Sequence, residues 1–373
     1  MSKEIQVVYI ITKLELGGAQ KVCLSLFNGI PLSTLISGSH GTLASQVTAK
    51  ENTILLSSIT REISFLSLFK ELRCFIEIVR HLRRLKKNYP SIIVHTHSTK
   101  AGLIGRWAAW CAGIATRVHT VHGYGFHNHQ KRLIWFGIYF LELITSFITT
   151  HYVCVSSEDV KTGVKLFPWF SKKHSIIRAA VDKKFYIPAR PINSKKTQLI
   201  FGSIACFKPQ KNIFDLLRAF KKVHDQEPRA RLELIGDGEL RPAIEQWITT
   251  HQLSAVITLH GWQSNVVPIM RQWNAFVLSS LWEGLPCAIV EARLLKLPVI
   301  SYDTGGIHDV IEHQQNGLLY KKQDWEGLAS GMLLVIRDAP LYQKLQMYSD
   351  DLHEFKTDYM IKKHIMLYKQ LAR

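Results

Sequence analysis

Two carboxylates, Glu283 and Glu291, lie on either side of a short turn-forming segment, Gly284-Leu285-Pro286. The apolar run 275–278 before them is typical of a buried strand, and the apolar spacing after Pro286 predicts a helix whose first turn accommodates the proline. Free amides and the helix dipole at such an N-terminus favour an anion. At a rise of about 1.5 Å per residue, Glu291 lies about 7 Å along from Pro286, the reach from a phosphate to its ribose. The segment predicts a nucleotide-sugar site in which carboxylates bind sugar hydroxyls; a chance pair is the alternative.

A second basic segment, Lys208-Pro209-Gln210-Lys211-Asn212, follows the apolar run 199–204. It places two ammonium groups at the carboxyl end of a strand, where parallel sheets bind their ligands. Such groups would stabilise the charge that builds on a departing nucleoside diphosphate. The alternative is a solvated basic turn.

Glycines follow the first predicted strand, 5–12. Gly17 and Gly18 stand before an amphipathic helix, where a backbone without side chains can approach a phosphate or sugar; an ordinary tight turn is the alternative. This pair is not the G-x-G-x-x-G fingerprint of dinucleotide binding, and Gly236-Asp237-Gly238 lacks the third glycine. A dehydrogenase is therefore not favoured.

Histidines are concentrated between positions 95 and 129: His95, His97, His119, His122, His127 and His129. Strand alternation points His95 and His97 to one face with no third ligand specified, so a metal site is not favoured. His122 ends a predicted strand and precedes Gly123-Tyr124-Gly125, which places it to contact a substrate. A structural histidine is the alternative.

The elements that must position these residues alternate between strand and helix. Strands are predicted at 5–12, 53–56, 91–95, 117–121 and 152–155, and again at 199–204, 232–235, 256–259, 275–278 and 299–301. Between 30 and 60 only 53–56 is typical of a strand. Helices are predicted at 64–87, at 100–112 and through about 149. This order predicts two α/β domains with parallel sheets, joined by the polar segment 182–196.

The composition agrees with a two-domain protein of the cytosol. A chain of 373 residues is long for one core, and 47% hydrophobic and 20% charged residues are ordinary for a soluble protein. Six cysteines without a C-x-x-C pair favour neither zinc nor a disulfide framework. The net charge of +18 predicts an acidic partner, which is nucleic acid, an anionic membrane or a phosphorylated substrate.

Two apolar segments bear on a membrane. The run 133–148 is too short to span a bilayer and contains Glu142, so it is interpreted as a buried helix. The helix 64–87 has an apolar stripe with basic residues mainly to one side of it. This pattern fits either a solvated face or a face that lies on anionic lipid headgroups. The stripe comprises Leu66, Phe69, Leu72, Ile76, Val79 and Leu82, and the basic residues are Lys70, Arg73, Arg80 and Arg84.

The ordered motifs resemble those of retaining GT-B glycosyltransferases of family 4 over essentially the whole chain. They are Gly17-Gly18-Ala19-Gln20, His95-Thr96-His97-Ser98, Val121-His122-Gly123, Cys154-Val155-Ser156, Lys208-Pro209-Gln210-Lys211, Gly236-Asp237-Gly238, Glu283 with Glu291, and Thr304-Gly305-Gly306. The resemblance implies two Rossmann-like domains that face each other across a cleft, at 1–182 and 197–355. It also implies a final helix, 356–373, that returns to the first domain.

The resemblance also implies roles. Glu283 contacts the donor sugar, Glu291 the ribose, and Lys211 the diphosphate, while Gly284, Leu285 and Pro286 complete the donor site. Gly17, Gly18 and His122 line the reacting face, and His97 and Gly123 are candidates beside it. Many members carry an arginine where this chain has Cys206, and Lys208 is the candidate replacement. The resemblance implies no cofactor and no metal bound by the protein.

The predicted activity is transfer of a hexose or N-acetylhexosamine, with retention, from a UDP-sugar to a lipid-linked saccharide in capsule or O-antigen assembly. The His122-Gly123-Tyr124-Gly125-Phe126 pattern resembles that of enzymes of this group. The expected place of action is the cytoplasmic face of an anionic membrane, without nucleic acid. The alternatives are a GT-B sugar-nucleotide epimerase and a basic nucleic-acid-binding protein.

Overall fold

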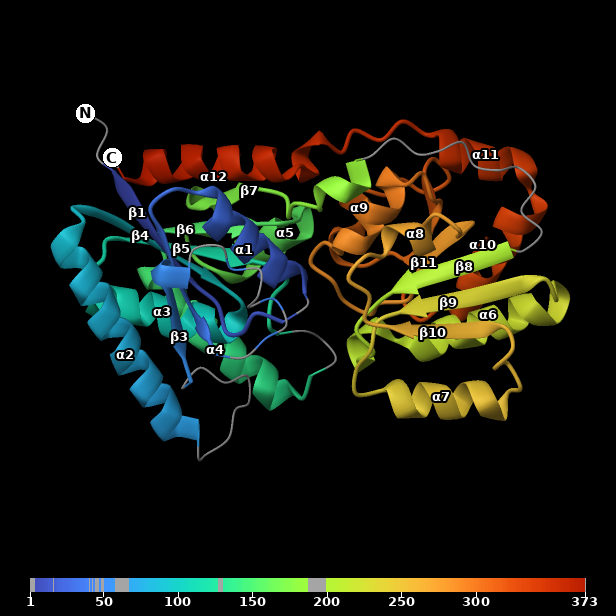
Figure 1. Ribbon diagram of the computed structural model, residues 1–373, viewed down its shortest axis with the longest axis horizontal. Coiled ribbons are helices and arrows are strands. Elements are labelled where there is room, and N and C mark those ends of the chain that lie inside the picture. Colours follow the sequence, from blue (N-terminus) through green and yellow to red (C-terminus); the bar gives the residue numbers. More distant parts are fainter. Residues whose placement is uncertain are drawn as a thin grey trace. The chain divides into compact units, whose positions relative to one another are not determined.

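The computed structural model describes residues 4–15, 17–39, 41, 43, 47, 50–57, 67–126, 130–186 and 199–372. Its contacts divide the chain into two compact units. Unit 1 comprises Met1–Ala180 with Glu354–Arg373, and unit 2 comprises Val181–His353. Each unit is a parallel β-sheet with packed helices (Figure 1). The expected class of two α/β domains is thus present in the structure.

In the described part of unit 1, seven parallel strands follow the order β3-β2-β1-β4-β5-β6-β7. The strands are β1 (Ile5–Ile10), β2 (Ser33–Gly38), β3 (Thr53–Leu56), β4 (Ser91–His97), β5 (Thr116–Val121), β6 (His151–Cys154) and β7 (His174–Ile176). The helices are α1 (Gly18–Gly29), α2 (Ser67–Asn88), α3 (Thr99–Cys111), α4 (Arg132–Ile148), α5 (Ser157–Leu166) and α12 (Thr357–Leu371).

The two faces of this sheet bury different side chains, because neighbouring residues of a strand point in opposite directions. Val8 and Ile10 pack with α2 and α3, whereas Tyr9 lies against α12, where its hydroxyl is 3.1 Å from that of Tyr368. The Tyr368 hydroxyl is also 2.5 Å from Nδ1 of His95. Helix α12 therefore belongs to unit 1, beside α1 (Figure 1).

Unit 2 repeats the plan with six parallel strands among its described residues, in the order β10-β9-β8-β11-β12-β13. The strands are β8 (Leu199–Ile204), β9 (Ala230–Ile235), β10 (Ile257–Gly261), β11 (Ala275–Leu278), β12 (Val299–Tyr302) and β13 (Gly317–Tyr320). The helices are α6 (Ile213–Gln226), α7 (Arg241–Thr250), α8 (Val267–Met270), α9 (Cys287–Leu294), α10 (Trp325–Arg337) and α11 (Ala339–Met347).

In each sheet the strand order reverses once beside a central strand. The reversal lies between β1 and β4 in unit 1 and between β8 and β11 in unit 2. Loops that leave the carboxyl ends of two such strands diverge, and the crevice between them is where open α/β sheets bind ligands. The loops after β1, β4, β8 and β11 are therefore the expected ligand-binding loops.

The sequence did not reveal strands β2, β7 and β13. Strand β7 has three residues, β13 is the short segment Gly-Leu-Leu-Tyr, and β2 carries polar residues and a glycine although it is fully buried. Such segments lack the alternation or the apolar run that identifies a strand. Most of the predicted linker 182–196 lies outside the described residues.

The predicted apolar stripe of α2 is partly wrong. Phe69 is 82% exposed, and Leu72 and Ile76 are also exposed. Val79 and Leu82 of the predicted stripe do face the core, where Cys74 and Ile78 join them. Steps of three and four residues along a helix define one face. Starting from Phe69 or from Cys74, such steps select two neighbouring faces of α2, and both carry apolar residues. Leu66 lies outside the described residues.

The interpretation of 133–148 as a buried helix is also wrong. Helix α4 exposes one face of large apolar side chains, while its inner side packs Trp135, Ile138, Tyr139 and Leu143 on the core. Its fully buried side chains are polar: Glu142, Thr145 and Ser146. Glu142 accepts two hydrogen bonds, of 2.7 and 2.9 Å, from the fully buried guanidinium of Arg106. Because Glu142 must reach the buried Arg106, this ion pair determines which face of α4 lies against the core. No helix in the described ranges is long and apolar enough to cross a membrane.

Replacement of Glu142 by glutamine is expected to destabilise unit 1 by about 2–3 kcal/mol, because Arg106 would remain buried without its counter-charge. Urea unfolding followed by circular dichroism measures the loss. The double replacement Arg106→Met with Glu142→Leu is the control and should cost less than Glu142→Gln alone, since it removes both charges. A double variant that loses as much stability as Glu142→Gln, or more, would contradict the assignment of a buried ion pair.

Candidate active site

Three loops of unit 2 meet at the carboxyl ends of β8, β11 and β12. The Ser279 hydroxyl donates to the carbonyls of Lys211 and Asn212, both at 2.9 Å. The amide N–H of Leu281 donates to the Gln210 carbonyl at 2.8 Å, and the Gln210 side chain donates to the Trp282 carbonyl at 2.8 Å. These bonds hold the basic loop after β8 against the acidic loop after β11.

Lys211 and Glu283 form an ion pair at this junction. The Lys211 side chain is 17% exposed and that of Glu283 is 8% exposed. Two partly desolvated charges at contact distance attract each other more strongly than a surface pair. The structure thus brings together two residues predicted from sequence motifs that lie 72 positions apart.

The loop that carries Glu283 enters α9 as the sequence suggests, with one difference. Pro286 is extended and forms the N-cap, so the helix begins at Cys287 and the proline lies just before its first turn. Glu291, in the same helix, is buried. Gly284 accepts a 2.6 Å hydrogen bond from the Gly306 amide, and Leu285 is buried.

Gly305 has a backbone conformation that its neighbours require. Its φ is +58°, in the left-handed region, and a Cβ atom there would lie 2.0 Å from the carbonyl oxygen of Glu283. The Thr304 hydroxyl donates to the Leu281 carbonyl at 3.1 Å. The glycine turn after β12 therefore packs on the backbone of the acidic loop.

Gly305→Ala is expected to destabilise unit 2 by about 1–3 kcal/mol and to displace Glu283, because neither the φ angle nor the space suits a side chain. Thermal unfolding measures the stability. Gly137→Ala, at a site with nothing within 4 Å of the added Cβ, is the control. Equal melting temperatures for the Gly305 variant and the unsubstituted protein would contradict the prediction.

Lys208 precedes the 3₁₀ turn Pro209–Lys211, and its amide N–H donates to the Cys206 carbonyl at 2.8 Å. Gly236 and Gly238, in the loop after β9, pack on the segment just before this turn: a Cβ at Gly236 would meet the Ala205 carbonyl, and one at Gly238 would lie 2.6 Å from the Phe207 carbonyl oxygen. The Gly-Asp-Gly motif is therefore a packing element that supports the basic loop.

In unit 1, the loops after β4 and β5 bring His97 and His122 together. Nδ1 of His97 lies 3.0 Å from Nε2 of His122, and their rings are 5.4 Å apart. His97 is fully buried, and its Nε2 has no hydrogen-bond partner in the described part of the chain. Gly123 has a φ of +92°, which turns the chain directly after His122.

The surroundings of the two imidazoles favour their neutral form. Burial, followed by repulsion from His364, lowers the pKa of His122 to about 3. Burial, with smaller contributions from His122 and His364, holds the pKa of His97 well below its usual range. A buried imidazole without a carboxylate partner loses more by desolvation when it is charged than when it is neutral. The environment of His122 therefore favours the neutral imidazole, which acts through hydrogen bonds.

His95 and His119 have structural partners. Nε2 of His95 lies 2.6 Å from the Thr120 hydroxyl, and Nδ1 of His119 lies 2.9 Å from the Thr96 hydroxyl. His95 and His97 share a face, as strand alternation predicts, with stacked rings 4.5 Å apart. His127 and His129 lie outside the described residues. Among the residues that the structure describes, no three His, Cys, Asp or Glu side chains are grouped to hold a metal ion.

The glycine loop after β1 lies at the reversal point of the unit 1 sheet. Gly17 is the N-cap of α1 in an extended conformation, and the space beside its Cα is filled by the Gln20 amide group. Gly18 is exposed at the start of α1. The hydroxyl groups of Thr12, after β1, and Ser98, after β4, lie 2.5 Å apart and tie these two loops together.

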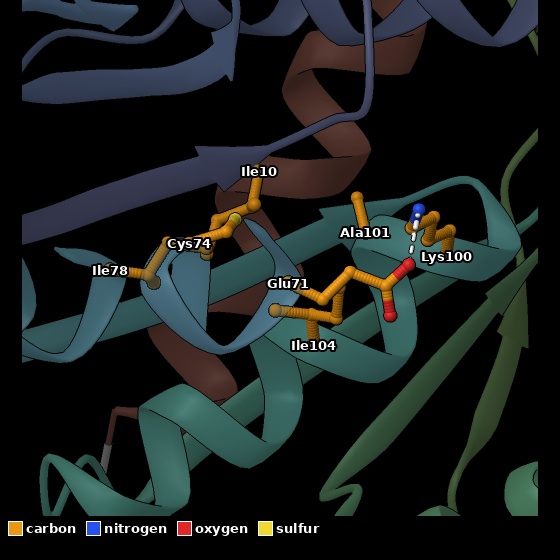
Figure 2. Close-up of a pocket in the computed structure, with 7 residues that line it drawn as sticks. All are labelled: Ile10, Glu71, Cys74, Ile78, Lys100, Ala101 and Ile104. Atoms are coloured by element: carbon orange, nitrogen blue, oxygen red, sulfur yellow. Dashed lines mark ion pairs between the residues drawn. The ribbon is translucent and has the colours of Figure 1, made fainter. Parts of the chain in front are cut away.

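A small hollow in unit 1 is separate from these loops. It lies between α2, α3 and β1 and is lined by Ile10, Glu71, Cys74, Ile78, Lys100, Ala101 and Ile104. Figure 2 shows Glu71 and Lys100 directed toward each other at one end, where they form a 2.8 Å ion pair. Most of the lining is apolar and none of the candidate site residues contributes to it, so this hollow is not part of the candidate active site.

Two family models match consecutive parts of the chain. The Glycosyltransferase Family 4 model matches residues 44–185, and the Glycosyl transferases group 1 model matches residues 188–351. An Escherichia coli protein, UDP-Gal:alpha-D-GlcNAc-diphosphoundecaprenol alpha-1,3-galactosyltransferase, is 28% identical over 91% of this chain and 89% of its own length. The chain belongs to the family 4 type of glycosyltransferases.

Solved structures agree on the fold of this glycosyltransferase. Anabaena HepE in complex with UDP-glucose superposes with a TM-score of 0.81 at 16% identity, covering 98% of this chain and 99% of that one. Sucrose-phosphate synthase from Thermosynechococcus elongatus superposes with a TM-score of 0.79 at 17% identity, covering 99% of each. The GT-B fold class predicted from the sequence is confirmed.

The sequence did not reveal the role of several groups that hold the glycosyltransferase loops in place, although three of them lie within the quoted motifs. Ser279, Gln210, Thr304, Thr12 and Ser98 make the connecting hydrogen bonds. Their position just after strand ends was a usable signal. Their partners were not predictable, because these are mostly backbone carbonyls of loops distant in the sequence. The positive φ of Ser98, +64°, also has no sequence signature.

Proposed function

We propose that this glycosyltransferase moves a hexose or N-acetylhexosamine from a UDP-sugar to a polyprenyl-diphosphate-linked saccharide in cell-surface polysaccharide assembly, with retention of configuration. Similarity to the Escherichia coli galactosyltransferase, which extends over both units, supports the donor and acceptor classes. The capsular polysaccharide glycosyltransferase CapM of Staphylococcus aureus, 23% identical over 75% of each chain, supports the pathway class.

The observation that carries the donor assignment is the Lys211–Glu283 pair at the point where the unit 2 sheet reverses. In this proposal Lys211 turns its ammonium to the diphosphate, Glu283 accepts hydrogen bonds from the sugar, and Glu291 accepts them from the ribose. Lys208 supplies a second cation in place of the arginine that stands at the position of Cys206 in many members. Gly284 and Leu285 present backbone N–H groups just before α9, and Pro286, which has no N–H, shapes the turn into that helix.

His122 serves as a hydrogen-bond donor in this proposal. If His97 donates Nδ1–H to Nε2 of His122, then His122 carries its proton on Nδ1, and the buried Nε2 of His97 is an unpaired acceptor. The opposite tautomers would leave a buried unpaired N–H on His97, which is rarer in proteins. His122 would thus direct an N–H at a sugar oxygen and orient the substrate without removing a proton.

The proposed reaction needs no protein base. The acceptor hydroxyl attacks the anomeric carbon from the side that the diphosphate leaves, the carbon–phosphate oxygen bond breaks, and the hydroxyl proton passes to the departing phosphate. Cationic groups aimed at that phosphate stabilise the charge that develops. The enzyme acts at the inner face of the cytoplasmic membrane, where such an acceptor is held, and binds no cofactor or metal of its own.

A panel of nucleotide sugars tests the proposal. One UDP-sugar is expected to raise the melting temperature, since a ligand of the folded state stabilises it. With that donor and a diphospho-polyprenyl GlcNAc acceptor, mass spectrometry should detect one added sugar, and NMR should show that its anomeric configuration matches the donor. An inverted linkage would refute retention. Isomerised donor without acceptor would indicate an epimerase, and binding of duplex DNA without response to UDP would indicate a nucleic-acid-binding protein.

A further inference from the structure

Helix α4 differs from an ordinary surface helix because its outward side is apolar, as is the inner side that packs on the core. Its large apolar side chains point outward: Leu133 is 85% exposed, Phe136 and Phe140 are each 59% exposed, and Phe147 is 57% exposed. Ile134, Leu141 and Ile144 are also exposed. At about 1.5 Å per residue this apolar face is about 21 Å long. We call these seven side chains the α4 apolar face.

The polar side chains of α4 are used inside unit 1. Glu142 binds Arg106, and the Thr145 hydroxyl accepts a 2.9 Å hydrogen bond from the Trp107 indole. Arg106 also donates to the Thr149 hydroxyl at 2.9 Å. These bonds fix the rotation of α4 about its axis, so the apolar face cannot turn inward without breaking a buried ion pair.

The surroundings of the α4 apolar face are aromatic and basic. The Trp169 ring, 57% exposed, lies 5.3 Å from the Phe147 ring, and Trp110 is exposed on α3, which packs against α4. Lys131 and Arg132 are exposed where α4 begins. On α2, which packs against the other side of α3 (Figure 1), Arg80 and Arg84 are exposed and follow the exposed Phe69, Leu72 and Ile76.

From this arrangement we propose that the α4 apolar face lies in the surface of an anionic lipid bilayer, with α4 parallel to the membrane plane. A helix with outward aromatic and aliphatic residues, flanking tryptophans and nearby cations is suited to the boundary between headgroups and acyl chains. The net charge of +18 adds attraction to anionic lipids. A bilayer matches this combination better than a second copy, because two copies would bring like charges together.

The same helix supports the loop that carries His122. The Phe126 ring lies 5.4 Å from that of Trp135 and 6.0 Å from that of Tyr139, both on the inner side of α4. Tyr124 stacks on Phe126 at 5.0 Å. A membrane-bound α4 would thus hold the His122 loop directly above the lipid surface. A role for this loop position rests on the lipid-linked acceptor of the proposed function. The docking surface on α4 does not depend on that acceptor.

Flotation of the purified full chain with vesicles tests the surface at one position. Gly137 lies exposed on α4 with nothing within 4 Å of an added Cβ, so a side chain there does not alter packing. With vesicles of phosphatidylglycerol and phosphatidylethanolamine, Gly137→Leu is expected to increase the partition coefficient about threefold or more, and Gly137→Glu to decrease it about tenfold. Met347→Glu, at an 80% exposed site on α11 of unit 2, is the matched control and should float as the unsubstituted protein does.

A double variant, Leu133→Glu with Phe140→Glu, is expected to lower the partition coefficient for these vesicles at least tenfold. Flotation of both Gly137 variants and of this double variant equal to that of the unsubstituted protein would overturn the inference. So would a dimer, measured by analytical ultracentrifugation, that the double variant dissociates while no form of the protein binds vesicles. Vesicle binding through α4 without any sugar transfer would refute the proposed function but support the docking surface.

Discussion

Lys211→Ala is expected to lower kcat/KM for the UDP-sugar donor by about 10²- to 10³-fold, the usual effect of removing one charge-stabilising group from a transition state. Lys211 is held by Glu283 and by the bonds that join the loops after β8 and β11. Its ammonium therefore starts near the predicted diphosphate position. Steady-state kinetics with donor varied at saturating acceptor measures the effect.

Glu283 permits a sharper form of this experiment. The single variants Lys211→Met and Glu283→Gln are compared with the double variant that carries both changes. If the two residues act as one unit, the fold-loss in kcat/KM of the double variant should be much smaller than the product of the two single fold-losses. Lys222→Ala, which breaks an exposed pair with Glu326 elsewhere in unit 2, is the control and should change kcat/KM less than twofold. Multiplicative losses for the pair would show that the ion pair has no role in donor turnover.

The donor loop was predictable because its signal is local. Strand β11, the Gly284-Leu285-Pro286 turn and α9 follow one another within 20 residues. Apolar runs and a proline are sufficient to place them. The spacing of Glu283 and Glu291 then fixes where two carboxylates stand on that unit. What the sequence could not supply was the Lys211–Glu283 contact, which depends on β8 and β11 being neighbours in the sheet.

The orientation of helices was less predictable than their presence. Helix α4 was recognised as apolar, and burial is the usual consequence of that composition. Its direction is set by the bonds of Glu142 to Arg106, a residue 36 positions away on α3. For α2, Ile76 and Ile78 are equally apolar, and only packing on α3 and β1 selects Ile78 for the core. Side-chain partners from distant elements decided both cases.

The histidines of unit 1 form a cluster whose partners could likewise not be read from the sequence. His364 and Tyr368 come from α12, more than 200 positions after His95, and the His95 and His364 rings stack 5.6 Å apart. The site residues that the sequence predicts for a GT-B enzyme do not require this cluster to be neutral. Burial of these side chains favours their neutral form, and this affects the stability of unit 1.

Unit 1 is expected to lose most of its stability between pH 7 and pH 5.5. Burial holds the pKa of five histidines below the value of about 6.5 that they have in an unfolded chain. For His122 burial lowers the pKa to about 3 and for His364 to about 4, and for the others it lies well below the usual range. The five are His95, His97, His119, His122 and His364.

The sign follows from proton uptake. Below pH 6.5 the unfolded chain binds protons at these positions while the folded unit does not, so the free energy of unfolding falls with decreasing pH. Each histidine contributes about 1.4 kcal/mol per pH unit, and five contribute about 7 kcal/mol by pH 5.5. That is comparable with the whole stability of an ordinary domain, about 5–15 kcal/mol. Carboxylates contribute little in this window because their usual pKa values lie lower.

Differential scanning calorimetry at pH 7.5, 6.5 and 5.5 measures the effect, with circular dichroism to follow loss of structure. His364→Gln keeps a donor for the Met360 carbonyl, which Nδ1 of His364 contacts at 2.8 Å, and removes one titrating group. The slope of stability against pH should then fall by about one fifth, because one of five equivalent contributions is gone. Met366→Gln, at an exposed position of the same helix, should leave the slope unchanged. A melting temperature of unit 1 that stays constant from pH 7.5 to 5.5 would mean that these histidines are protonated within the fold, and His122 would then be available as a cation after all.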